Sequence, residues 1–184
     1  MNKPRLSPIF CLCLLVLSAG CGHILYSDGP YHGRLIDRET KQPIEGAAVV
    51  AVWRKETPMI AEAQITYYDA QEAVTDREGN FTIPGIAGGS VNPLAKIREP
   101  LFTIFKPAYE VYDARRLPPP DETGRRVLTL RHLETREERL KNLRNVRIFP
   151  DVPEEKYPYF IELDLTESAY LGFTPKTTRK GGQQ

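Results

Sequence analysis

The sequence predicts an all-β domain, a seven-stranded β-sandwich that is followed by a C-terminal helix and tail. Short apolar runs, separated by turn segments rich in Gly, Pro, Asp and Asn, recur from residue 31 to residue 131, as is typical of small sandwiches. The composition, 41% hydrophobic and 27% charged, is that of a chain with a packed core. The 184 residues leave room for one such domain between a leader and an extension.

Three strands are expected in the first half of the domain. Residues 33–37 form a short apolar run that stops at a polar turn closed by Pro43. Residues 47–53 form a β-branched run without a breaker, which is the best candidate for a central strand. A weaker strand is expected at 63–68, after an irregular stretch that contains Pro58.

A hairpin and two further strands complete the expected sandwich. Residues 71–75 should pair with residues 81–85, because Asp76 and Gly79 between them supply turn chemistry. Phe81 begins an alternation of apolar and polar residues that indicates one buried and one wet face. The remaining strands are expected at 101–105 and 125–130.

From residue 132 onward the apolar period changes to that of a helix. Thr135 and Glu138 have the spacing of a capping box, which predicts a helix of about three turns that ends near Ile148. One face of this helix is apolar and should dock on the sandwich. Residues 132–184 are therefore expected to be a helix plus a partly ordered tail. The apolar face consists of Leu133, Leu140, Leu143 and Val146.

The first twenty residues have the three parts of an export signal. Lys3 and Arg5 give a basic start, residues 9–17 are apolar, and residues 18–20 are small. As a helix, the apolar run would be about 14 Å long, roughly half the thickness of the hydrocarbon core of a bilayer. We therefore expect residues 1–20 to be a cleaved leader and not a membrane span.

The end of the leader resembles the bacterial lipobox. Residues 17–21 read Leu-Ser-Ala-Gly-Cys, with serine in place of the usual leucine three residues before the cysteine. The resemblance implies that Cys21 carries the lipid, that residues 21–30 tether the body to a membrane of the cell envelope, and that Gly22 directs it to the outer membrane. The alternative is a plain secretory signal in which Cys21 is incidental.

Cysteine usage and charge exclude several classes of function. The three cysteines, Cys11, Cys13 and Cys21, all precede the predicted domain, which can therefore hold no disulfide, cysteine metal site or thiol nucleophile. Lys and Arg total 25 against 24 for Asp and Glu, so the chain lacks the basic excess that would indicate a nucleic-acid partner.

Several short segments follow one another in an order typical of one family. They are residues 33–37 (GRLID), Pro43-Ile44 with Gly46-Ala47, Thr75-Asp76 with residues 79–85 (GNFTIPG), and residues 106–109 (KPAY). In these segments residues 31–131 resemble the carboxypeptidase regulatory-like domain, with Ala108 where that family commonly has glycine. The resemblance implies a transthyretin-like β-sandwich, a scaffold whose roles vary widely.

Three groups of side chains are candidates for chemistry, and each also has a structural interpretation. The histidines lack the spacing of a metal pair and are expected at turns and edges. The carboxylates near the predicted hairpin could hold calcium or stabilise turns. The aromatic residues could line a carbohydrate-binding or peptide-binding face or pack within the sandwich. The groups are His23, His32 and His132; Asp69, Glu72, Asp76 and Glu78; and Trp53, Tyr67, Tyr68, Tyr109 and Tyr112.

Together these features favour a non-enzymatic, lipid-anchored envelope protein. The sequence has no nucleophile elbow, phosphate-binding loop or Tyr-Arg-Gly-Ser ending of the hydroxyisourate hydrolases, so neither catalytic residues nor a cofactor are expected. The sandwich would bind a protein or glycan of the envelope. The alternative is a structural accessory subunit that docks on a larger envelope assembly through residues 133–173.

Overall fold

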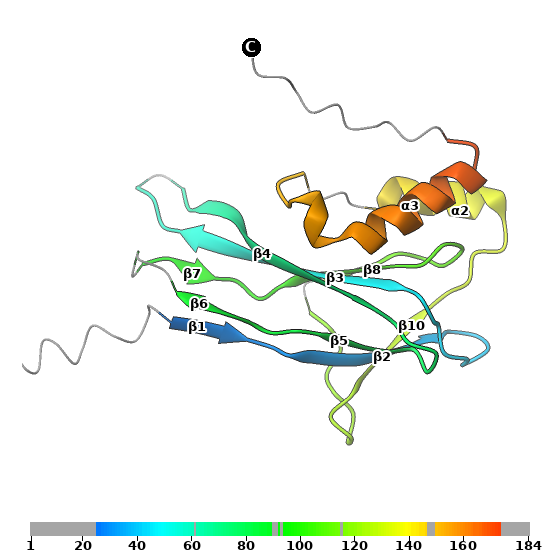
Figure 1. The fold of residues 1–184 in the computed structure, drawn as a ribbon, viewed down its shortest axis with the longest axis horizontal. Helices are drawn as coiled ribbons and strands as arrows, with labels where there is room; N and C mark the ends of the chain where they lie inside the picture. The colour runs from blue at the N-terminus through cyan, green and yellow to red at the C-terminus, as the bar shows by residue number, and fades with distance from the viewer. Residues whose placement is uncertain are drawn as a thin grey trace, which may run out of the picture.

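The computed structural model describes residues 25–60, 62–89, 92, 94–114, 116–146 and 150–173. Within this part of the chain, ten strands lie in several sheets, and the only α-helices are two short ones. The prediction of an all-β domain is therefore confirmed. The strands form two layers, and the helices cover the outer side of one of them (Figure 1).

The first layer is built around β2 (Tyr31–Asp37). This strand pairs in parallel with β10 (Arg126–Leu130) and antiparallel with β5 (Asn80–Ile83). Two further strands, β1 (Leu25–Asp28) and β6 (Ile86–Gly89), pair antiparallel with each other. Their register continues that of the β2–β5 pair. The β2–β5 ribbon is thus extended by β1 and β6 beyond a short break.

Two glycines allow the backbones to approach closely at this break. A Cβ atom on Gly29 would lie 2.7 Å from the Cα of Gly85, and one on Gly85 would lie 2.6 Å from the carbonyl oxygen of Asp28. The expected tether over residues 21–30 is therefore wrong for residues 25–28, which form a strand. Composition alone suggested a tether, but the backbone of these residues pairs with β6.

The second layer has the order β4-β3-β8-β9, with β7 (Lys96–Ile97) also paired to β3. β3 (Ala48–Thr57) is central, as predicted, and β8 (Leu101–Phe105) has the predicted bounds. β4 (Gln64–Val74) joins two stretches that the sequence analysis treated separately, and β9 (Tyr112–Ala114) lies at the far edge. β4 is the other edge of this layer.

β3 is apolar on both faces because each face contacts a different core. Val49, Ala51 and Trp53 belong to the cluster between the two layers, together with side chains of β2, β5, β8 and β10. The alternate residues pack against the C-terminal segment on the outside. A strand covered on both faces reads as a continuous apolar run, which is why the sequence identified it so clearly. These alternate residues are Ala48, Val50 and Val52.

The predicted hairpin between residues 71–75 and 81–85 is wrong. β4 and β5 belong to different layers, so the chain crosses from one sheet to the other. The turn itself is present: the Gly79 amide donates to the Asp76 carbonyl at 2.9 Å. Gly79 has φ +77°, and a Cβ there would lie 2.3 Å from the Leu35 carbonyl oxygen. The turn residues were identified correctly, but they do not specify the pairing partner.

The C-terminal segment contains α2 (Arg136–Asn145), a 3-10 turn at Glu154–Lys156, and α3 (Pro158–Tyr170). The capping box is confirmed, because Thr135 and Glu138 each accept a hydrogen bond from the other's backbone amide. α2 ends three residues before the expected Ile148. α3 was not predicted.

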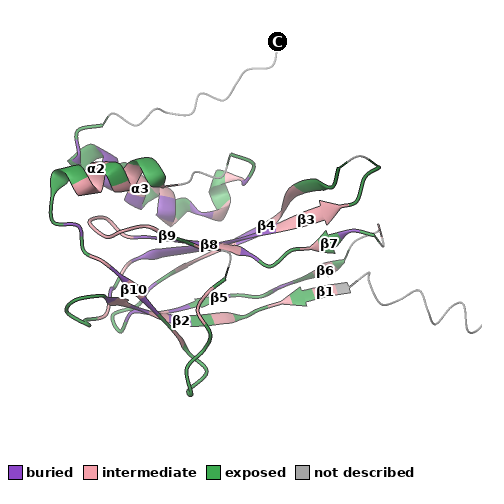
Figure 2. Ribbon diagram, turned by 180° about the vertical axis from the view of Figure 1, so that it is seen from behind, coloured by how far each residue is buried: buried purple, intermediate pink, exposed green. Residues whose placement is uncertain are grey.

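The packing of α2 agrees with the prediction in part. None of its residues is fully buried, but Leu143 and the C-cap residue Val146 are partly buried and pack against the outer core. Hydrogen bonds attach it as well: Asn142 accepts from the Val111 amide and donates to the Tyr109 carbonyl, both at 2.9 Å. The helix with buried side chains against the sheet is α3 (Figure 2). α2 therefore docks through polar and apolar contacts together.

Candidate functional site

The predicted lipidation site, Cys21, lies outside the described residues, as do the leader and His23. The description begins at Leu25, four positions after the cysteine. None of the helices described is long and apolar enough to cross a membrane.

The start of the described chain is attached to the core through Asp28. The Tyr31 hydroxyl and the Trp53 indole nitrogen each donate to the Asp28 carboxylate at 2.7 Å, and Tyr26 donates to it as well. Burial by itself raises the pKa of Asp28, but these donors outweigh it and hold the pKa below its ordinary value. Burial and the neighbouring carboxylate raise the pKa of Tyr26 and of Tyr31. Trp53 is thus a buried structural residue and not part of a binding face.

The other candidate aromatic residues do not share one surface. Tyr67 packs on the outer core, whereas Tyr68 and Tyr112 pack on the core between the layers. Tyr109 meets the ring of His132 edge-on, with 5.1 Å between ring centroids. The alternative that these residues pack within the sandwich therefore holds, and they do not form one aromatic face.

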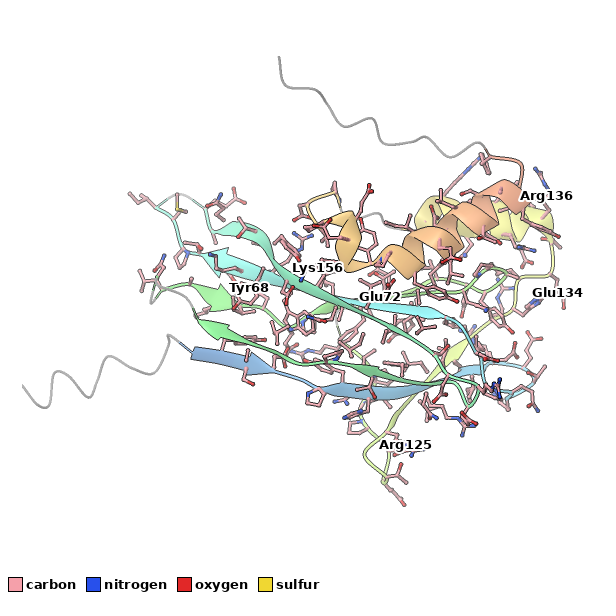
Figure 3. The ribbon with its side chains drawn as sticks, viewed as in Figure 1. Tyr68, Glu72, Arg125, Glu134, Arg136 and Lys156 are labelled. Carbon is pink, nitrogen blue, oxygen red and sulfur yellow. The ribbon has the colours of Figure 1, made fainter. Side chains whose placement is uncertain are left out.

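The candidate carboxylates have separate structural partners. Asp69 accepts a hydrogen bond from Lys156 at 2.8 Å, and Asp76 accepts from the Glu78 and Asn80 amides within its own turn. Glu72 accepts from two amides at the start of α3 (Figure 3). In the described part of the chain, no three His, Cys, Asp or Glu side chains are grouped so that they could hold a metal. The structure therefore gives no support to the calcium interpretation.

The two described histidines make separate contacts. His32 is exposed and lies 3.0 Å from the Thr82 hydroxyl across the β2–β5 pair. His132 contacts Tyr109 at the corner after β8, where the two residues form an isolated β-bridge.

An open hollow of about 400 Å³ lies between β4 and the β5–β6 connection. Tyr68, Asp69 and Gln71 line one side, and residues 85–87 line the other. β4 and β5 are each the last strand of their sheet, so the hollow lies where the two layers are open to solvent. The Tyr68 hydroxyl reaches across to Gly88, where an added Cβ would lie 2.1 Å away. This hollow is the candidate functional site.

The acidic group of the hollow is held in place. The Asp69 carboxylate accepts from Lys156 and from the Ala70 amide, both at 2.8 Å, and from the Gln71 side chain at 3.4 Å. Burial raises the pKa of Asp69, but these donors, above all Lys156, lower it below the ordinary value. The carboxylate therefore stays ionised at neutral pH in a fixed orientation.

Only part of this site could be identified from the sequence. Tyr68 and Asp69 were among the candidates, whereas Gln71 and residues 85–87 were missed as lining residues. Residue 85 had been assigned only to a strand end and to the family motif. No local signal could have joined the two sides, because they lie on different layers. No family model, curated protein or solved structure matches the chain significantly.

Proposed function

We propose that this chain is a lipid-anchored, non-enzymatic protein of the bacterial cell envelope whose β-sandwich binds a protein or glycan. Cys21 would carry the lipid and hold the body at a membrane, which the lipobox resemblance suggests is the outer membrane. The observation that carries the binding proposal is the open hollow between β4 and residues 85–87.

The groups around the hollow suit recognition of a polar ligand. Its volume falls in the range of small-ligand sites. Tyr68 offers a ring, Gln71 an amide, and Asp69 an ionised carboxylate whose orientation is already fixed. A side chain that is held before binding loses little conformational freedom when a ligand arrives.

We also propose that residues 31–131 belong to the carboxypeptidase regulatory-like family. Two observations support it. The strands form two layers, with β10-β2-β5 in one and β4-β3-β8-β9, together with β7, in the other, as a sandwich requires. In addition, the motif positions Gly46, Gly79 and Ala108 all have positive φ. These are turn positions that favour glycine, and they fit the structural roles that the motif implies.

The C-terminal segment is less well suited to the alternative role as a docking arm. Phe160 and Leu163 of α3 are buried against the outer face of the sheet, in a cluster with Val50 and Phe105. Part of the apolar surface that a partner would need is therefore already covered by the protein's own sheet, while Leu165, Tyr170 and Phe173 stay exposed. We accordingly favour the sandwich as the binding element.

Photo-crosslinking in intact cells tests the binding proposal. Benzoylphenylalanine in place of Gln71, in the full-length lipoprotein, should give an adduct after irradiation, since its ketone inserts into C–H bonds of protein and glycan alike. The matched control carries the same group in place of Lys141, an exposed residue of α2. Adducts at both positions in equal yield, or at neither, would contradict the proposal.

A further inference from the structure

Four of the nine large apolar side chains that are exposed in the described residues lie at one end of the molecule. The β3–β4 loop presents Met59, which is 61% exposed, and Ile60, which is fully exposed. The loop before β7 presents Leu94, which is 65% exposed, and Ile65 at the start of β4 is also exposed. We call these four residues the apolar tip. Side chains of this kind at loop ends contribute nothing to the two described cores.

Strand pairing places the apolar tip beside the start of β1. Leu25 is paired with Gly89, so the loop that carries Leu94 leaves the sheet next to the first described residue. β7 pairs with the end of β3, which brings the same loop beside the β3–β4 loop. Figure 1 shows the start of β1, the end of β6 and the β3–β4 loop at one end of the molecule.

The proposed lipid anchor is close to this end. Cys21 precedes Leu25 by four residues, and four residues of fully extended chain span at most about 14 Å. A lipid on Cys21 would therefore hold the start of β1 within roughly that distance of the bilayer surface. The end of the molecule that carries the apolar tip is the end that the anchor brings to the membrane.

We propose that the apolar tip inserts into the interfacial region of the bilayer and orients the domain on it. This inference rests on the proposed lipid anchor. Because the anchor already confines the domain to the membrane, a few apolar side chains suffice to fix its orientation. The occupant of the apolar tip is thus the membrane itself, not a second protein.

The charges around the apolar tip favour an apolar contact over an electrostatic one. Both signs are present in equal number on the flanking strands and loops, and Glu56 pairs with Arg98 at 2.8 Å. The contact should therefore not require anionic lipid. The flanking charged residues are Lys55, Lys96 and Arg98 on the positive side and Glu56, Glu62 and Glu99 on the negative side.

This orientation also determines how far the candidate site lies from the membrane. Tyr68 is four residues along β4 from Gln64, which corresponds to roughly 13 Å at the rise of a strand. The hollow would then face the space just above the membrane surface. A ligand bound there would be a component that lies close to the lipid headgroups.

Single-cysteine labelling of the mature lipoprotein tests the inference. The body has no cysteine of its own, so Ile60→Cys introduces one thiol for an environment-sensitive fluorophore. In phosphatidylcholine vesicles, the label should shift its emission to the blue and lose intensity to spin-labelled lipid. Adding phosphatidylglycerol should leave both effects unchanged. The control is Val74→Cys, an exposed apolar position at the opposite end of β4, where neither effect is expected.

Mass spectrometry of the same sample tests the lipid anchor on Cys21 separately from the insertion of the apolar tip. An acylated Cys21 without quenching at position 60, or with equal quenching at position 74, would overturn the apolar tip while leaving the anchor intact. A Cys21 without an acyl mass would overturn both. Acylation with quenching at position 60 alone is the expected result.

Discussion

Glu72 shows how one residue of a strand determines the position of a helix. Its carboxylate accepts hydrogen bonds from the Phe160 amide at 2.7 Å and the Tyr159 amide at 3.0 Å. The N-cap residue of α3, Tyr157, forms no side-chain cap of its own. A carboxylate at a helix N-terminus satisfies free amides and interacts favourably with the helix dipole. β4 thus supplies the cap that the helix lacks.

Replacing this cap should destabilise the fold. Glu72→Ala leaves two amides without their acceptor, and we expect a loss of about 1–2 kcal/mol in the free energy of unfolding. Urea denaturation measures the loss. Glu62→Ala is the matched control, because Glu62 is an exposed glutamate in the loop before β4. Equal and small effects of the two substitutions would show that Glu72 does not hold α3.

Ala108 occupies a position that favours glycine. It has φ +66°, in the left-handed region that side chains with a Cβ disfavour. We therefore expect Ala108→Gly to raise the free energy of unfolding by up to about 1 kcal/mol, since relief of backbone strain outweighs the greater freedom of glycine in the unfolded chain. Ala114→Gly, within β9, should be destabilising. A loss of stability in Ala108→Gly would contradict the assigned turn conformation.

The Asp28 cluster predicts a pH dependence of stability. Because the folded state lowers the pKa of Asp28, its contribution is complete above the unfolded pKa of about 3.9 and is lost as the pH falls through the lower, folded pKa. Asp28→Asn should therefore be clearly less stable than the parent near pH 7, and the gap should narrow towards pH 2. Urea midpoints across this range measure the gap. Glu122→Gln, in an exposed turn, should show no such convergence.

At the level of elements, the C-terminal segment is where prediction and structure differ most. The capping box located the start of α2, and Leu143 and Val146 of its expected apolar face do pack on the outer core, but the hydrogen bonds of Asn142 were not foreseen. α3 had usable signals: Pro158 suits the first helical position, and Phe160, Leu163 and Glu167 follow at helical spacing. The cap from Glu72 lies 87 residues away and leaves no local trace.

The strands were easier to predict where burial alone determines them. β8 is buried on most of its length, and its predicted bounds were correct. The first six residues of β3 are buried, so its start was predicted within one residue, but its less buried last four residues were missed. The hairpin error has a different origin. Asp76 and Gly79 specify a tight turn, but whether the next strand pairs with the previous one or crosses to the other layer depends on Leu35 and the pairing of β5 with β2. Residues 85–87 were missed as lining residues of the hollow for the same reason, because the pairing of β5 with β2 leaves no local signal in the sequence.

A substitution at Phe160 tests whether α3 is packed on the sheet. This side chain is 1% exposed and packs on Phe105 with 5.5 Å between ring centroids. Phe160→Ala should lower the free energy of unfolding by about 3–5 kcal/mol, the range for buried aromatic truncations. Leu165→Ala, at a position of the same helix that is 42% exposed, should have a small effect. Similar effects at the two positions would mean that α3 is not docked on the sheet.

Buried ionic contacts also join α2 and α3. Arg139 forms two hydrogen bonds with Glu167, which is almost fully buried, and lies 4.1 Å from the centre of the Tyr170 ring. Arg136 donates to the Leu171 carbonyl at 2.7 Å. The two helices therefore form one unit, and that unit attaches to the sheet through α3. Phe160 and Leu163 face the sheet, whereas Leu165 and Tyr170 of the same helix are exposed, and the unit covers only the outer face of one layer.

For the whole molecule, the proposed anchor determines which end of the domain faces the membrane. The start of β1 and the apolar tip lie at one end, and the hollow lies a short distance along the same strands. If Cys21 carries lipid, the protein is a scaffold that presents its open edge close to a membrane. If it does not, neither the proposed orientation nor the proposed location follows.

Intact-mass spectrometry of the protein purified from its host membrane tests this claim most directly. The mature chain should begin at Cys21 and carry the mass of a diacylglyceryl group, with or without a third acyl chain on the new amino terminus. Cys21→Ala should abolish both the modification and the membrane association. A mature chain that begins at another residue, or one with an unmodified Cys21, would contradict the account.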